Sequence, residues 1–140
     1  MSVQILTGDT AQRETRPVMP AMKRGFRGKC PHCGNGKLFR AFVKPVDNCS
    51  VCSEDYTPQR ADDLPAYIVV SIVGHIVVGG FMATEMLTNW PSWLHLAIWI
   101  PITIIMSLAL LQPVKGAIIG LQWANYMHGF GGEDDHINVI

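Results

Sequence analysis

Residues 64–88 read LPAYIVVSIVGHIVVGGFMATEMLT, and this apolar run decides the fold. Between Leu64 and Ala83 it carries no Lys, Arg, Asp or Glu, and it meets the length of roughly 20 apolar residues that a helix needs to cross a bilayer. Residues 93–112, WLHLAIWIPITIIMSLALLQ, form a second run without formal charge, after the short link NWPS at 89–92. We therefore predict an antiparallel hairpin of two transmembrane helices. A soluble pair of core helices is the alternative, but each would need a polar face, which these runs almost lack.

The charges of the chain are distributed unevenly. Its 140 residues contain 11 Lys+Arg and 11 Asp+Glu, so the formal net charge is zero, and 49% of the residues are hydrophobic. Residues 1–60 hold ten basic and five acidic residues, whereas residues 61–140 hold one basic residue, Lys115, and six acidic ones. Because basic residues favour the cytoplasmic side of a membrane, this asymmetry predicts a multi-pass protein with both termini in the cytoplasm. We attribute the basic half to this topology and to contact with anionic lipid headgroups, and the zero net charge argues against a nucleic-acid partner.

Four cysteines define a candidate metal site. Their spacing is C-x2-C-x15-C-x2-C, which lies within the range expected of a four-cysteine zinc site. Two cysteines three residues apart on a tight turn can direct both sulfurs to one ion, and two such turns complete a tetrahedron. The four predicted ligands are Cys30, Cys33, Cys49 and Cys52.

We expect Zn(II) in a structural role, because a module of about 30 residues buries too little apolar surface to fold alone and four thiolates leave no open position for a substrate. Iron held as in rubredoxin, two disulfides and a labile redox-sensing zinc remain alternatives. Gly34 suits a left-handed turn after the first cysteine pair, whereas Ser53 stands where a glycine would be more comfortable.

The fold class that follows is an α-helical membrane protein. A two-helix transmembrane hairpin, with spans at about 64–88 and 93–112, is preceded by a small β-rich zinc ribbon and followed by a C-terminal interfacial helix. Its segments are a flexible arm at 1–24, the cytoplasmic ribbon at 25–60, the hairpin with its C-terminal helix at 61–130, and an acidic tail at 131–140.

The C-terminal helix is expected at residues 113–130, either on the membrane surface or as a kinked continuation of the second span, because Pro113 can start or kink a helix. Gly116, Gly120 and Ala124 recur every four residues and so form one flat face of that helix.

Five further polar residues are candidate site residues. Asp62 and Asp63 precede the first span, where they either cap the helix or form a cation-binding pair with Arg60 as an ion partner. His75 falls near the middle of that span, and Thr103 and Ser107 are its candidate hydrogen-bond partners. The other two, Glu85 and His95, are expected to lie together near the short loop.

The ordered motifs resemble one family of small bacterial membrane proteins, the domain of unknown function 983 family. The strings that carry the resemblance are Cys30-Pro31-x-Cys33-Gly34-x-Gly36-x-Leu38-Phe39, Cys49-x-x-Cys52, Ala61-Asp62-Asp63-x-Pro65-Ala66-Tyr67 and Gln122-Trp123. The resemblance implies the bacterial cytoplasmic membrane as the location and a four-cysteine zinc-ribbon module. Members are often encoded near genes for cytochrome oxidase subunits and assembly factors, which implies an association with those complexes. This chain departs from the pattern by lacking a glycine after the second cysteine pair.

Three functional hypotheses remain. The first is a non-enzymatic accessory or assembly factor, whose ribbon docks a cytoplasmic partner and whose hairpin packs against a larger membrane complex such as cytochrome oxidase or its assembly machinery. The second is a membrane redox, metal-handling or quinone-handling protein that uses His75, Glu85 and His95. The third is a membrane-tethered ribbon that senses nucleic acid or lipid.

Overall fold

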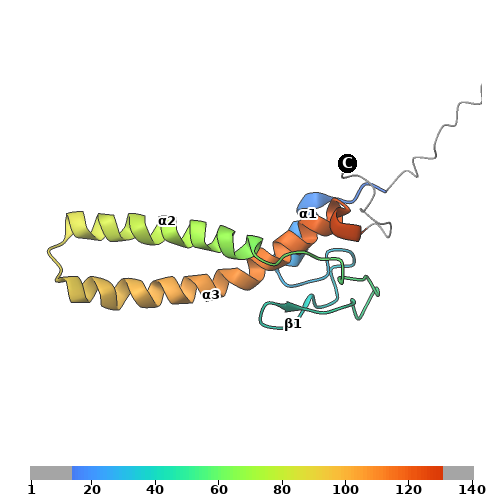
Figure 1. Cartoon of the computed structure of the whole chain (residues 1–140), viewed down its shortest axis with the longest axis horizontal. Coiled ribbons are helices and arrows are strands. Elements are labelled where there is room, and N and C mark those ends of the chain that lie inside the picture. Colours follow the sequence, from blue (N-terminus) through green and yellow to red (C-terminus); the bar gives the residue numbers. More distant parts are fainter. Residues whose placement is uncertain (1–13, 131–140) are drawn as a thin grey trace, which may run out of the picture.

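The computed structural model describes residues 14–130, which form an elongated molecule with a two-helix shaft and a smaller head at one end (Figure 1). The shaft is residues 64–112, and the head is residues 14–63 together with 113–130. The elements follow in the order α1 (Val18–Phe26), β1 (Phe39–Ala41), β2 (Lys44–Pro45), α2 (Leu64–Leu87), α3 (Ser92–Ala124) and the short 3-10 helix η1 (Met127–Gly129).

The helix α2 coincides with the first apolar run. It begins with a proline at its start, Pro65, where the missing N–H leaves no helical bond unmade. Asp63 stands at the N-cap position, as expected of a capping residue, but its side chain makes no cap hydrogen bond. The helix ends at Leu87, after which Thr88 is extended. The predicted span therefore agrees with the observed helix to within one residue.

The helix α3 is longer than the second apolar run and continues into the head. It spans 33 residues and contains Pro101 and Pro113. Of the two alternatives for residues 113–130, the structure has the continuation of the second helix rather than a separate interfacial helix. Figure 1 shows that α3 changes direction as it enters the head and rises past the start of α2, and prolines inside a helix are the usual cause of such a bend. The helix ends at Ala124, and Tyr126 follows in a left-handed conformation (φ 54°).

The two shaft helices are long and apolar enough to cross a membrane. They are not the core helices of a larger body, because only 11% of the most apolar 18 residues of α2, and 6% of those of α3, are buried. Gly80 faces α3 and leaves the space that the Trp99 indole fills, since a methyl group there would collide with the ring. Gly79 has no neighbour within 4 Å and faces outward. Of these two adjacent glycines, Gly80 thus serves the packing of the hairpin, and Gly79 leaves an open surface.

Part of the N-terminal arm differs from the expectation of a flexible segment. Residues 18–26 form α1, which packs across the head portion of α3. The contact is between small residues: a Cβ on Gly25 would fall on the carbonyl group of Gly116, and one on Gly120 would fall on that of Ala21. The flat face of Gly116 and Gly120 is thus a helix-crossing surface, and its partner is the small-x3-small pair Ala21 and Gly25.

The remaining arm residues, 1–13, and the acidic tail at 131–140 lie outside the described residues.

The head contains less sheet than a β-rich module implies. β1 and β2 form a two-stranded antiparallel hairpin in which Phe39 pairs with Pro45. Two isolated bridges, Lys29 with Lys37 and Asn48 with Asp55, are the other strand-like contacts of the described head. Buried residues of the head, among them Leu38 and Tyr56, belong to one apolar cluster with the buried face of α3. The head is therefore built onto α3 and is not a free-standing ribbon.

We predict that Gly116→Ala loosens the head, because the new methyl group would collide with the carbonyl of Gly25. Such overpacking destabilises by about 1–3 kcal/mol, which thermal unfolding in mild detergent would detect as a lower melting temperature. The matched control is Gly74→Ala, where nothing lies within 4 Å of the added methyl. The control is expected to be neutral or up to about 1 kcal/mol more stable, because alanine favours the helix. Equal melting temperatures for Gly116→Ala and Gly74→Ala would contradict the close contact between α1 and α3.

Candidate metal centre

The four cysteines lie on two turns with similar hydrogen-bond patterns, the first turn being one residue longer than the second. In the first turn, the Cys30 N–H donates to the Gly36 carbonyl (2.8 Å) and the Gly34 N–H donates to the Cys30 carbonyl (2.9 Å). In the second turn, the Cys49 N–H donates to the Glu54 carbonyl (2.9 Å) and the Ser53 N–H donates to the Cys49 carbonyl (3.0 Å). The isolated bridges at residues 29 and 37 and at 48 and 55 close the two turns. The repeated sequence spacing has become a repeated backbone geometry.

The four sulfur atoms form a compact group. All lie within 4.8 Å of one another, and the two closest cross-turn pairs are Cys30–Cys52 at 3.6 Å and Cys33–Cys49 at 3.7 Å. Four thiolates at roughly 2.3 Å from a tetrahedral ion are about 3.8 Å apart, whereas a disulfide requires about 2.05 Å. All four cysteines are free. The group therefore has the separation of a four-sulfur metal site and not that of two disulfides.

Backbone amides face the sulfurs on both turns. The Asn35 N–H is directed at the Cys33 Sγ (3.5 Å), and the Val51 N–H is directed at the Cys49 Sγ (3.4 Å). Gly36 packs directly against Cys49, because a Cβ on Gly36 would overlap the Cys49 sulfur. This close approach explains why the first turn carries a second glycine, and it brings the two turns together.

The two turns differ in the residue that adopts the left-handed conformation. Gly34 has φ +73°, as its position after Cys33 led us to expect. Ser53 takes the equivalent position of the second turn with φ +61°. A side chain in this region crowds the backbone at a cost of roughly 1–2 kcal/mol. The absence of a glycine leaves the second turn in the same shape, but under strain.

Tyr56 completes the site and was not a candidate from the sequence. It is 1% exposed, and its hydroxyl donates to the Cys30 Sγ at 2.6 Å. Burial, followed by the hydrogen bond to Cys30, raises the pKa of the Tyr56 phenol far above its ordinary value, so the hydroxyl keeps its proton. In the sequence, the only sign of this role is that Tyr56 follows the last cysteine by four residues. A single tyrosine at that position is equally consistent with a buried core residue and with a hydrogen-bond donor to a cysteine.

The thiols are not equivalent acids. The backbone N–H groups of Gly36 and Asn35 lower the pKa of Cys33 to about 6, so this sulfur is a thiolate at neutral pH. Burial, with the neighbouring cysteine side chains, raises the pKa of Cys52 to about 12. A metal ion must therefore displace the Cys52 proton, and rising pH favours binding.

Glu85 and His95 lie together near the loop, as predicted. His95 is 2% exposed, and its Nε2 lies 3.1 Å from the Glu85 Oε2. The separation is that of an ion pair, without the alignment of a hydrogen bond. Phe81 and Trp90 pack on the imidazole, with ring centroids 5.1 and 5.6 Å away. The imidazole is thus enclosed by aromatic rings at the end of the hairpin, whereas the Glu85 side chain is 59% exposed.

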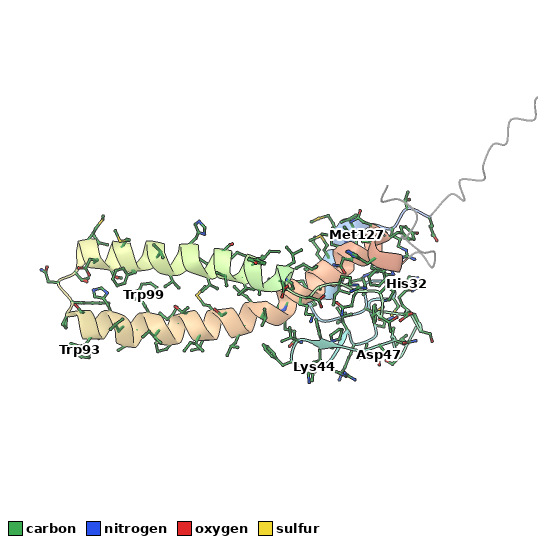
Figure 2. All side chains as sticks on the ribbon, viewed as in Figure 1. His32, Lys44, Asp47, Trp93, Trp99 and Met127 are labelled. Atoms are coloured by element: carbon green, nitrogen blue, oxygen red, sulfur yellow. The ribbon has the colours of Figure 1, made fainter. Side chains whose placement is uncertain are left out.

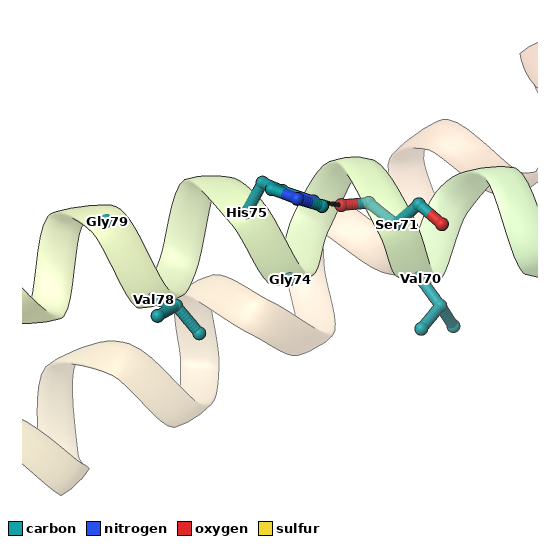
Figure 3. Close-up of a pocket in the computed structure, with 6 residues that line it drawn as sticks. All are labelled: Val70, Ser71, Gly74, His75, Val78 and Gly79. Carbon is teal, nitrogen blue, oxygen red and sulfur yellow. Dashed lines mark hydrogen bonds between the residues drawn. The ribbon is translucent and has the colours of Figure 1, made fainter.

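His75 lies on the outer face of α2, away from the other helix. Its predicted partners were wrong: the Thr103 hydroxyl donates to the Trp99 carbonyl of its own helix. The Nδ1 of His75 lies 2.6 Å from the Ser71 carbonyl, one turn earlier (Figure 3). Because a carbonyl only accepts, Nδ1 carries the proton, and in the neutral form of the ring Nε2 would be an acceptor. Within residues 14–130 that nitrogen has no partner. His75 therefore does not form a site with Glu85 and His95.

Asp62 and Asp63 are exposed at the junction of head and shaft. In the described chain neither is in an ion pair. Arg60 does not serve them as an ion partner; instead its backbone N–H donates to the Gln122 side chain at 3.0 Å. No third ligand accompanies the two carboxylates in the described chain, where the cysteine quartet is the only cluster suited to a metal.

The chain belongs to the family described as "protein of unknown function (DUF983)", whose model matches residues 39–123. The match includes the second cysteine pair and both shaft helices, and the first cysteine pair precedes it. Neither the curated proteins nor the solved structures contain a match to this chain.

We predict that Ser53→Gly stabilises the metal-bound protein by about 0.5–1 kcal/mol, because glycine adopts the left-handed conformation without crowding. Thermal unfolding of the metal-loaded protein measures this change. The matched control is the reverse replacement, Gly34→Ser, which should destabilise the first turn. A lower melting temperature for Ser53→Gly would show that the serine side chain has another role.

We predict that Tyr56→Phe weakens metal binding roughly tenfold, because loss of an outer hydrogen-bond partner of a ligand typically has an effect of this size. Competition with a chromophoric chelator measures the affinity. Tyr126→Phe is the control, because that hydroxyl donates to the Glu14 carbonyl, away from the sulfurs. An unchanged metal affinity in Tyr56→Phe would show that the Tyr56 hydroxyl does not contribute to metal binding.

Proposed function

We propose that the protein is an integral membrane protein whose shaft crosses the bilayer. The exposed apolar surface of the shaft supports this: Val70, Met86 and Ile105 keep 70%, 79% and 65% of their surface exposed. Soluble monomers rarely expose apolar patches of such extent. At 1.5 Å per residue the 24 residues of α2 rise about 36 Å, enough for a hydrocarbon core about 30 Å thick.

The head then lies in the cytoplasm and the loop at 88–91 lies outside. Every Lys and Arg of the described chain belongs to the head, including Lys115 on α3, and neither the shaft nor the loop has any. Trp93 lies at the loop end of the shaft (Figure 2) and is 68% exposed, as expected of an indole ring at the membrane interface. Both termini are thereby assigned to the cytoplasm of a bacterial cell.

The metal of the head is proposed to be zinc in a structural role. The cysteine quartet supplies four sulfur ligands and so fills a tetrahedron. Zinc is the usual occupant of such a site, and iron is the other ion that this ligand set accepts.

We propose that the protein is a non-enzymatic accessory subunit or assembly factor of a larger membrane complex. The observation that carries this proposal is the imidazole of His75, which faces the lipid with an unpartnered nitrogen. A polar side chain inside a membrane is expensive unless another polar group meets it. We propose that the group that meets His75 belongs to a transmembrane helix of another protein. This helix would carry a hydrogen-bond donor at the same depth in the membrane as the His75 Nε2.

The surroundings of His75 fit a helix. They form an open groove of about 500 Å³ along α2, lined by Val70, Ser71, Gly74, His75, Val78 and Gly79. Gly74 and Gly79 have nothing within 4 Å, so a second backbone can approach closely, as small residues allow in membranes. The head would dock a cytoplasmic part of the same complex. The association implied by the family resemblance makes cytochrome oxidase and its assembly machinery the first candidates.

We predict that His75→Leu separates the protein from its complex. Interhelical hydrogen bonds in membranes contribute about 0.6 to 2 kcal/mol, so recovery of the partner in mild detergent should fall at least about threefold. Mass spectrometry of the purified material, with a photo-crosslinking residue at position 78, identifies the contacting helix. The control is Ile76→Leu, a neighbouring exposed position that does not line the groove.

Three outcomes would contradict the proposal. Release from membranes by alkaline carbonate would exclude a spanning shaft. A lone monomer in mild detergent would exclude a stable complex. A coloured preparation whose visible absorption disappears in His75→Leu would favour the redox alternative.

A further inference from the structure

A second pocket lies where the apolar shaft meets the basic head. It has a volume of about 330 Å³ and is formed by the end of α1, the turn between β1 and β2, and α3. Its lining is Phe26, Arg27, Gly28, Phe42, Leu108, Ala109, Gln112 and Pro113. In Figure 1 the β1–β2 hairpin lies beside the bend of α3, at the shaft side of the head.

The packing of the head on α3 fixes the depth of this pocket. Gly25 contacts Gly116, which places Phe26, the last residue of α1, and Arg27 after it against the last turn of the shaft. If the shaft spans the bilayer, as proposed above, this turn lies at the cytoplasmic boundary of the hydrocarbon. The pocket is then at the level of the lipid headgroups.

The walls of the pocket differ in chemistry. Leu108 is 53% exposed and continues the apolar surface of α3, and Phe26 and Phe42 are each 51% exposed. Arg27, which is exposed, and Gln112 are the residues with polar side chains in the lining. No acidic residue lines the pocket. A ligand that fits has an anionic group above an apolar chain.

The charges around the pocket also favour an anionic ligand. Within residues 14–130, no Lys or Arg is in an ion pair with a carboxylate. Arg40 and Lys44 flank Phe42 on the hairpin and are exposed. The head thus presents unneutralised cations beside an apolar cleft, and such cations attract the anionic lipids of a cytoplasmic leaflet.

From this arrangement we propose that the pocket binds one anionic phospholipid. The phosphate lies on the Arg27 guanidinium, which can donate two parallel hydrogen bonds to it. One acyl chain lies along Leu108, and Phe26 and Phe42 enclose its upper part. The bound lipid would fill the angle between head and shaft and so hold the head at a defined height above the membrane. This inference rests on the proposed membrane insertion.

The test is native mass spectrometry of the full chain released from micelles that contain equal amounts of phosphatidylglycerol and phosphatidylcholine. The wild type should retain one phosphatidylglycerol in preference to phosphatidylcholine. Arg27→Gln should reduce this preference about fivefold, since one basic residue near the surface contributes about 1 kcal/mol. Phe42→Ser should shorten the lifetime of the bound lipid. The matched control, Lys37→Gln, removes the same charge from an exposed residue outside the pocket and should leave retention unchanged.

Equal retention of the two lipids, or the same loss in Arg27→Gln and Lys37→Gln, would overturn the proposal. A dimer that forms in place of the lipid adduct and dissociates in Phe42→Ser would assign the pocket to a second copy of the chain. Metal content and melting temperature confirm that each variant is folded. Carbonate extraction separates the two claims: a chain that resists extraction but shows no lipid preference contradicts only the lipid site, whereas an extracted chain contradicts membrane insertion.

Discussion

The structure depends on holding four sulfur atoms within 4.8 Å of one another. Thiolates at this separation repel one another, and a divalent cation among them converts the repulsion into attraction. The two short strands contain only three and two residues and cannot hold the head by themselves. Gly36, the two backbone amides and the Tyr56 hydroxyl all serve the same purpose, which is to bring the sulfurs together and to stabilise their negative charge.

The head is joined to the shaft by a second close approach. α1 crosses α3 where glycines bring the two backbones into contact, and Arg16 secures the start of this segment. Its guanidinium donates to the Trp123 carbonyl at 2.9 Å and lies 4.2 Å from the Trp123 ring centroid. The helix crossing and the apolar cluster that the head shares with α3 join the head to the end of this helix.

The sequence predicts those features of the structure best that a single strong physical constraint determines. An uncharged run as long as 64–83 has few stable alternatives to a helix, and so α2 and the start of α3 were predicted to within one residue. The end of α3 lies beyond the predicted span, because the helix continues past residue 112 into the head. Metal-ligand spacing is similarly restrictive, and the cysteine quartet was predicted completely. Gly34 was recognised because few residues other than glycine adopt its conformation.

The features that were missed depend on tertiary contacts. A nine-residue helix such as α1 is unstable by itself, so nothing in the local sequence separates it from an arm. The rotation of α2 could not be predicted because its apolar residues surround the helix, and His75 was therefore expected to face α3 when it faces outward. Tyr56 is recognisable only once Cys30 is beside it. These are properties of packing, and periodicity does not encode them.

The head is proposed to fold around one tetrahedral ion held by four sulfurs. X-ray absorption spectroscopy of the purified full chain at the zinc edge measures the ligands directly. We expect one zinc per chain with four sulfur neighbours at about 2.3 Å and no nitrogen or oxygen ligand. A mixed first shell, or a metal-free protein with an intact head, would contradict it.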